Sequence, residues 1–278
     1  MRRAAGILCR IGAPLSIAAL AAGRAASCEG KATFDHARDA ARGADDFQDL
    51  LKRATAKKDG SLWWDCRHAR ALHDVATASD SAMTPAERKE MLARAFKLLD
   101  ERLAGEGSTG ADAADAWRWK GTVLSALSSH MGTDESIKAA STIRDAWLRA
   151  LELNPRDASA SHLLGRWHMK MASLSWIEVL AARALYSTPP AGTHQEALDR
   201  FLAAEEADPG FWMANRVQLA AAMAKVGRGK EGEAWARRAA AMPVLTEDDA
   251  ESKKELEALA AANRWTLDAP GDGADDRA

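Results

Sequence analysis

Three segments of the chain share one ending, in which a large aromatic residue stands eight positions before a proline. The pairs are Trp147 with Pro155, Phe201 with Pro209, and Trp235 with Pro243. In the first two segments an alanine, Ala150 or Ala204, lies five positions before the proline. Self-similarity of this kind indicates a repeat protein, in which each unit packs mainly on its neighbours.

The spacing of these endings matches the tetratricopeptide repeat, a helical hairpin of about 34 residues. Pro209 and Pro243 are 34 residues apart, whereas Pro155 and Pro209 are 54 apart, which is one repeat plus 20 residues. Leu164 and Gly165 stand where the repeat has its Leu-Gly pair. The pattern therefore predicts consecutive helical hairpins, one of which contains an insertion.

The 20 additional residues lie within a single repeat. Gly165 and Ala197 are 32 positions apart, although a regular repeat separates the corresponding residues by about 12. The stretch between them keeps a helical apolar face. We therefore expect the insertion to lengthen the first helix of its hairpin, giving one helix over residues 161–186 with a length of about 39 Å.

Packing explains why these residue types recur. A lone hairpin cannot bury its apolar face, so small residues let its two helices approach while aromatic residues fill the space between hairpins. The residues that we assign to such structural positions are Trp117, Gly121, Trp147, Ala150, Pro155, Leu164, Gly165, Ala197, Phe201, Ala204, Pro209, Trp235 and Pro243.

The composition agrees with a chain built from helices. It contains 63 alanines but only six valines and six isoleucines. Alanine is the strongest helix former, whereas β-branched residues favour strands. We predict an all-α, tetratricopeptide-like solenoid of three to four irregular hairpins over residues 45–262, followed by a disordered acidic tail at residues 263–278.

Residues 1–28 differ from the remainder in charge. They contain four arginines and no acid, whereas the other 250 residues carry a net charge of −6. This composition is typical of a mitochondrial transit peptide, which we rank first. A bacterial secretory signal, with Cys28 as the lipid anchor of an envelope scaffold, and a disordered end are the alternatives. The apolar run in this segment, from Ile11 to Ala22, is too short to span a bilayer, so we expect no transmembrane helix.

No sequence pattern points to catalysis, a cofactor or a metal site. His68 and His73 are five residues apart. His162 and His168 are six apart, so neither pair has the i, i+4 spacing that places two ligands on one helical face. The cysteines are scattered, and Cys66 is expected to be a small core residue. A formal net charge of −2 disfavours nucleic acid. We predict a non-enzymatic protein without a cofactor.

A set of longer motifs carries a family resemblance. The most specific is Leu-Leu-Gly-Arg-Trp at residues 163–167, followed by Thr-Pro-Pro at residues 188–190. Further motifs occupy residues 151–158, 196–205, 208–211 and 246–249. Together they resemble the regulator of microtubule dynamics family. The resemblance implies a helical-repeat protein associated with microtubules and spindles, with some relatives at mitochondria and one that handles phospholipid and tethers membranes.

The repeat register predicts which side chains face the concave side of the solenoid. They are Arg118, His162, Arg166, Lys170 and Arg216. Many glutamates fall on the second helices instead, so we expect a basic groove. Arginine pairs well with carboxylate or phosphate, so the partner is expected to be an acidic tubulin tail, another acidic protein segment or an anionic phospholipid. A lipid-transfer or tethering module at mitochondrial membranes and an ordinary solvated face are the alternatives.

The N-terminal segment predicts a mitochondrial address, with the cytoplasm and the cytoskeleton, including the spindle, as the alternative. We expect a C-terminal fluorescent fusion of the full chain to reach mitochondria and to be shortened there, because the acid-free segment acts as the address. A fusion that lacks residues 1–28 should lose this location. Microscopy together with the apparent mass decides the question, and a full-length fusion that stays diffuse and unprocessed would contradict it.

Overall fold

The computed structural model describes residues 43–56, 60–104, 109–185 and 190–267, together with residues 34, 35, 37 and 41. Within these residues every regular element is an α-helix. The helices are α3 (Ala44–Ala56), α4 (Leu62–Thr77), α5 (Pro85–Leu103), α6 (Ala111–Ser128), α7 (Thr133–Leu153), α8 (Ala158–Ala172), α9 (Trp176–Leu185), α10 (His194–Ala207), α11 (Met213–Lys225), α12 (Gly229–Ala240) and α13 (Glu247–Asn263). The predictions for residues 1–28 and 268–278 concern residues outside this description.

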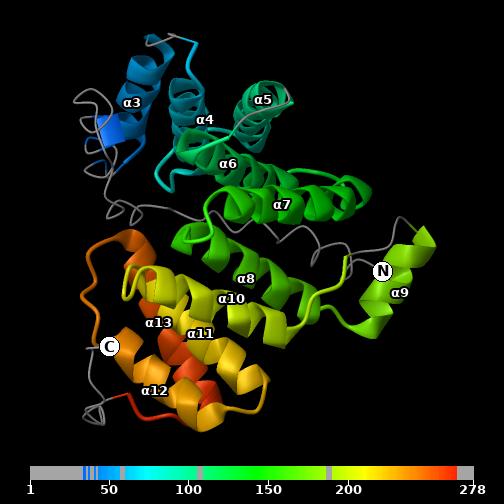
Figure 1. The fold of residues 1–278 in the computed structure, drawn as a ribbon, viewed down its shortest axis with the longest axis vertical. Helices are drawn as coiled ribbons and strands as arrows, with labels where there is room; N and C mark the ends of the chain where they lie inside the picture. The colour runs from blue at the N-terminus through cyan, green and yellow to red at the C-terminus, as the bar shows by residue number, and fades with distance from the viewer. Residues whose placement is uncertain are drawn as a thin grey trace.

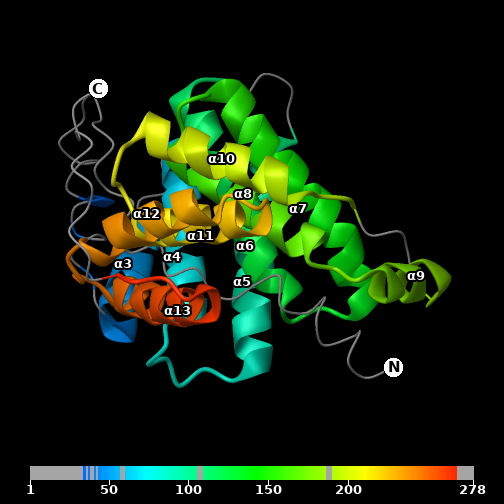
Figure 2. The same cartoon turned by 90° about the horizontal axis from the view of Figure 1, so that it is seen from below.

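Four helical hairpins follow one another along the chain. They are α4 with α5, α6 with α7, α8 with α10, and α11 with α12. Figure 1 shows them stacked from the blue end of the chain to the orange end, with α3 before the first hairpin. In Figure 2, α13 and α10 lie on opposite sides of α11. The predicted all-α, tetratricopeptide-like fold with three to four irregular hairpins is confirmed.

A glycine on the first helix meets an aromatic ring on the second helix in two of the hairpins. A Cβ atom built at Gly121 would lie 2.5 Å from Nε1 of Trp147. The same atom built at Gly165 would lie 2.6 Å from a ring carbon of Phe201. No side chain larger than hydrogen fits at either position without displacing the ring. The pairs that the repeat register assigned are therefore in contact, and each sets the spacing of its hairpin.

The last hairpin reaches close packing in a different way. Leu219 stands where α6 and α8, the first helices of the two middle hairpins, have glycine, and it is completely buried. The close approach has moved to the second helix, where a Cβ atom at Gly232 would lie 2.9 Å from the backbone oxygen of Ala220 and 3.0 Å from the ring of Trp265. Trp265 thus packs on the hairpin.

The other assigned positions have the surroundings that the register predicts. Ala150, Leu164, Ala197 and Ala204 are all 0% exposed, which is what close helix contacts require. Trp117 is half-buried against the main core, and Trp235 packs where the last two hairpins meet. Pro155, Pro209 and Pro243 lie just beyond the C-terminal ends of α7, α10 and α12.

The expected single helix over residues 161–186 is wrong. It is divided into α8, which ends at Ala172, and α9, which begins at Trp176. The Ser173 hydroxyl donates a 2.7 Å hydrogen bond to the backbone oxygen of Met169, and its amide also bonds to the last turn of α8. These bonds close the last turn of α8, and residues 174–175 are not helical. Figure 1 shows α9 standing apart from the hairpins.

Capping boxes begin three helices at sites that the sequence marks with a threonine followed by an acid three positions later. Thr84 with Glu87 begins α5, Thr193 with Glu196 begins α10, and Thr246 with Asp249 begins α13. In each box the hydroxyl accepts from the later backbone amide, while the carboxylate accepts from the threonine amide. Among the described residues, no helix is both long enough and apolar enough to cross a membrane.

The glycine contact predicts the result of one substitution. Gly165→Ala should lower the free energy of unfolding by about 1–3 kcal/mol, because the new methyl group overlaps the Phe201 ring in a filled core. Gly229→Ala is the matched control, since a Cβ atom there meets nothing within 4 Å. Urea unfolding of both variants compares them. Equal stability of the two variants would contradict the spacing role of Gly165.

Candidate functional site

Two of the five predicted groove residues are arginines whose charge is already matched by acids. Arg118 on α6 pairs with Asp115 and, at 3.0 Å, with Asp157 at the N-cap of α8. Arg216 on α11 pairs with Glu205 of α10 at 2.8 Å. Both guanidinium groups are largely buried, with side-chain exposures of 14% and 16%. In this conformation they hold helices together.

Arg118 belongs to a larger buried cluster of charges between α4, α6 and the start of α8. Arg67 donates to Asp35 at 2.9 and 2.8 Å and also pairs with Asp115. Burial alone would raise the pKa of Asp115, but Arg67 and Arg118 hold that pKa well below its usual range. The carboxylate is therefore ionised at neutral pH. No local sequence pattern marks this cluster, because its members are up to 122 positions apart.

His162 lies in the core and does not line an open groove. Its side chain is completely buried, and its ring centre is 4.4 Å from that of Trp212. Asn215 donates from Nδ2 to the backbone oxygen of Phe201, so its Oδ1 accepts from His162 Nδ1 at 3.0 Å. Burial, with help from the nearby Arg166, lowers the pKa of His162 to about 3. The imidazole is thus neutral at pH 7 and structural.

Arg166 on α8 is the predicted cation with the most unusual surroundings. It is half-buried, and burial lowers its pKa. The acidic groups that act on it are Glu255, Asp248 and Glu251, all from α13. No hydrogen bond or ion pair joins Arg166 to any described residue closely enough to satisfy its donors. Lys170, also half-buried, follows one turn later on the same side of α8.

Helix α13 packs on α11 and α12, and its acids act on Arg166 of α8. We call the surface formed by α8 and α11 the inner face. Asp248, Glu251 and Glu255 have i, i+3, i+7 spacing and so form one stripe. Trp212 donates from Nε1 to Asp248 at 2.6 Å, and Gln218 donates to Glu255 at 2.7 Å. The inner face of the solenoid therefore already carries an acidic segment, whose charges act on Arg166.

The first turn of α13 also contacts the first hairpin. The hydroxyl of Ser79, in the turn between α4 and α5, donates to Glu247 at 3.2 Å. The helix that follows the last hairpin thus contacts the first hairpin, across 168 positions of sequence. The stripe spacing was visible in the sequence, but its partner on α8 was not, because nothing local relates residue 166 to residue 251.

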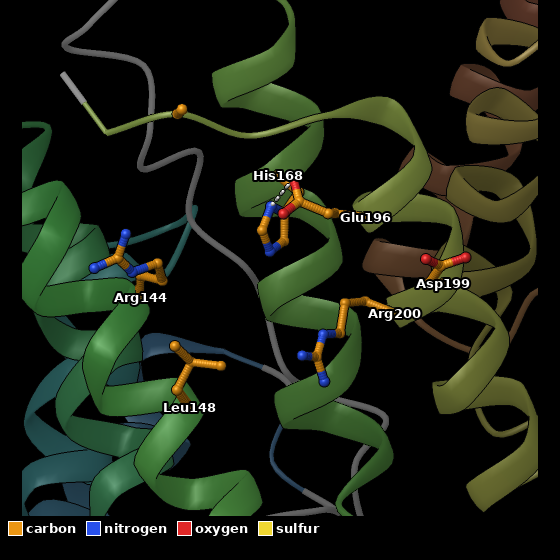
Figure 3. A pocket seen from close by; sticks show the side chains of 7 residues that line it. Arg144, Leu148, His168, Glu196, Asp199 and Arg200 are labelled. Carbon is orange, nitrogen blue, oxygen red and sulfur yellow. Dashed lines mark ion pairs between the residues drawn. The ribbon is translucent and has the colours of Figure 1, made fainter.

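A cleft of about 430 Å³ opens between α7 and α10 over α8. In Figure 3, Arg144 and Arg200 lie on opposite sides of His168, Arg200 extends toward α8, and Asp199 is turned away. Burial lowers the pKa of His168, Arg200 and Arg144 lower it further, and Glu196 at 3.4 Å opposes them. Arg144 also donates to Asp145. Because cations and acids are balanced here, the cleft favours neither an anionic nor a cationic ligand.

The structure offers little for covalent or metal chemistry in its described part. Cys66 is completely buried, and burial raises the pKa of its thiol far above the usual range, so it is a core residue as predicted. Among the described residues, no three His, Cys, Asp or Glu side chains are grouped so that they could hold a metal ion.

Comparison with known proteins identifies the family. The family model described as regulator of microtubule dynamics protein 1-3 matches residues 32–264. The chain belongs to this family. The resemblance drawn from its motifs is confirmed.

Two relatives illustrate the similarity. Regulator of microtubule dynamics protein 1 of Mus musculus is 31% identical over 76% of this chain and 66% of its own length. Regulator of microtubule dynamics protein 3 of Rattus norvegicus is 32% identical over 77% of this chain, which spans only 44% of that relative. A crystal structure of MamA aligns over 77% of this chain and 92% of its own, with 15% identity and a TM-score of 0.37. That likeness is too distant to carry an argument.

The buried acid at the start of α13 makes stability depend on pH. Burial raises the pKa of Asp248 from 3.8 to about 6. The folded state therefore holds this proton more tightly than the unfolded state does, and the contribution of Asp248 to stability falls as pH rises from about 4 to about 6.

Asp248→Asn removes this ionisation while keeping an acceptor for Trp212 Nε1. At pH 7 the variant should be more stable than the wild type by about 1–2 kcal/mol. This is less than the free energy equivalent to the full pKa difference, because solvent screens part of the charge. At pH 4 the two should be equally stable. Urea unfolding at both pH values measures the difference. A difference that is the same at pH 4 and pH 7 would show that ionisation of Asp248 is not its source.

Proposed function

We propose that this chain is a non-enzymatic interaction protein that binds acidic protein segments, such as the acidic tails of tubulin, through Arg166 and Lys170 on the inner face. One observation carries the proposal: burial lowers the pKa of Arg166, and the acids of the α13 stripe oppose that shift, so they act on this cation. The chain itself thus provides an example of the chemistry that this surface accepts. The relatives, which are named as regulators of microtubule dynamics, indicate where such a partner would be found.

The position of Arg166 suits this task physically. Its guanidinium group stays charged at any physiological pH even though burial lowers its pKa. Partial burial also reduces the screening that weakens attraction between fully exposed charges. Arg118 and Arg216 each form a direct ion pair with an acid of the fold, so we do not include them in the binding site. The predicted groove is thereby narrowed to one face of α8.

Removal of the two cations tests the proposal. Arg166→Gln combined with Lys170→Gln should weaken binding to microtubules and to a short polyglutamate peptide by about tenfold, equivalent to about 1.4 kcal/mol. Binding should also become less sensitive to salt, because fewer charges take part. Co-sedimentation measures the first affinity and titration calorimetry the second.

A variant with the same change in net charge serves as the control. Lys138→Gln combined with Arg149→Gln removes two cations from exposed sites on α7, where each pairs with an acid on its own helix. This variant should bind as the wild type does. Microtubules from which the acidic tails have been removed by limited proteolysis should bind neither the wild type nor the control variant. Equal losses in both variants, or no loss in either, would contradict a site on α8.

A further inference from the structure

Two adjacent residues that precede α3, Phe34 and Asp35, are held against α4 by their side chains. The Phe34 ring is 2% exposed and stands edge-on to two tryptophan rings of α4, with its centre 6.3 Å from that of Trp63 and 5.2 Å from that of Trp64. Arg53 of α3 lies over the same ring. Buried aromatic pairs prefer this edge-to-face geometry. Phe34 thus completes an aromatic cluster at the end of the stack where α3 and α4 pack side by side (Figure 1).

The carboxylate of Asp35 is held by a fork of two hydrogen bonds. Arg67 of α4 donates from Nε to Oδ1 at 2.9 Å and from Nη2 to Oδ2 at 2.8 Å. Arg70, on the same helix, has its Nη1 atom 3.7 Å from Oδ1. A bidentate arginine–carboxylate pair combines charge with a fixed geometry, so it selects a carboxylate at this position. An asparagine there would keep one acceptor oxygen and lose the charge.

The side chains of α4 that make these contacts, Trp63, Trp64 and Arg67, are also held by partners of their own. We call these three side chains the α4 site. The two tryptophans pack edge-on against each other, with ring centres 4.6 Å apart. The Arg67 guanidinium lies 4.5 Å from the centre of the Trp63 ring and also pairs with Asp115. We therefore expect the α4 site to keep its form when empty, and a preformed site binds at a lower entropic cost.

Loss of the Asp35 carboxylate would leave Arg67 with unmatched donors. The Arg67 side chain is only 11% exposed, so water satisfies these donors poorly. Asp115 cannot take the place of Asp35, because it is shared with Arg118. A buried cation that has lost one of its acids attracts another carboxylate. The empty α4 site would therefore favour an acid that lies directly beside an aromatic ring.

We propose that the α4 site is a docking site for a short segment in which an aromatic residue is directly followed by an acid, and that Phe34 and Asp35 occupy it as a ligand from the same chain. A segment of another chain with this chemistry binds when the chain's own segment is absent. Cleavage before Phe34 would leave the site filled, whereas cleavage after Asp35 would vacate it. The α4 site lies on the first hairpin, so this inference does not depend on the surface of α8.

Substitution of the two occupants within the full chain vacates the site and leaves α4 unchanged. The probe is a labelled peptide of residues 30–41 with blocked ends, which has two basic and two acidic side chains and so no net charge. The Phe34→Ala, Asp35→Asn chain should bind it at least about tenfold more tightly than the wild type, whose own segment fills the site in most molecules. Fluorescence anisotropy measures both affinities.

Altered peptides and a control chain test specificity. Peptides that carry alanine in place of Phe34, or asparagine in place of Asp35, should each bind the vacated chain about tenfold more weakly than the unaltered peptide, because each lacks one of the two anchoring groups. The control chain is Asp49→Asn, which removes an exposed acid from α3. It should bind the peptide as weakly as the wild type does.

A stability measurement covers the case in which the vacated chain is poorly folded. The unaltered peptide should then raise the urea midpoint of that chain, since a ligand of the folded state stabilises it. Asp35→Asn alone, at a side chain that is 33% exposed, keeps the Phe34 ring and should give an intermediate affinity. Equal binding of the peptide by the vacated and wild-type chains, or equal binding of all three peptides by the vacated chain, would overturn the proposal and leave Phe34 and Asp35 as packing residues.

Discussion

The contact between a glycine on the first helix of a hairpin and an aromatic ring on the second sets the geometry on which everything else depends. At Gly121 and Gly165 the rings of Trp147 and Phe201 lie where a Cβ atom would be. Each contact fixes how closely the two helices pack and so where the next hairpin begins. The position of α8, with Arg166 on one side and Gly165 on another, follows from this spacing.

Charge is distributed over the fold in two distinct ways. Between α4, α6 and α8, arginines and aspartates neutralise one another in a buried cluster around Asp115. At the inner face, acids on α13 and a cation on α8 are close enough to influence one another without forming short ion pairs. The first arrangement joins neighbouring hairpins. The second leaves a cation whose partners can be exchanged, which is why we place the binding surface there.

The sequence alone was sufficient for the local parts of this structure. Proline spacing predicted the hairpins and the Leu164–Gly165 pair predicted a close helix contact, because each is determined within one repeat. The expected long helix was wrong, because an apolar pattern that continues through the insertion does not show that the helix is interrupted between Ala172 and Trp176. His162 was assigned to a groove because register gives a direction along a helix but not the depth to which neighbouring helices bury it. The effect of the α13 acids on Arg166 relates residues about 85 positions apart, so no local sequence pattern predicts it.

The central claim is that an acidic segment binds beside Arg166, and photo-crosslinking tests it most directly. A polyglutamate peptide with a photoreactive group at one end would be crosslinked to the full chain, and mass spectrometry would locate the attachment. We predict attachment to α8 or to the facing side of α11 and loss of that product in the Arg166→Gln, Lys170→Gln variant. Attachment confined to α5, α7 or the cleft around His168 would contradict it.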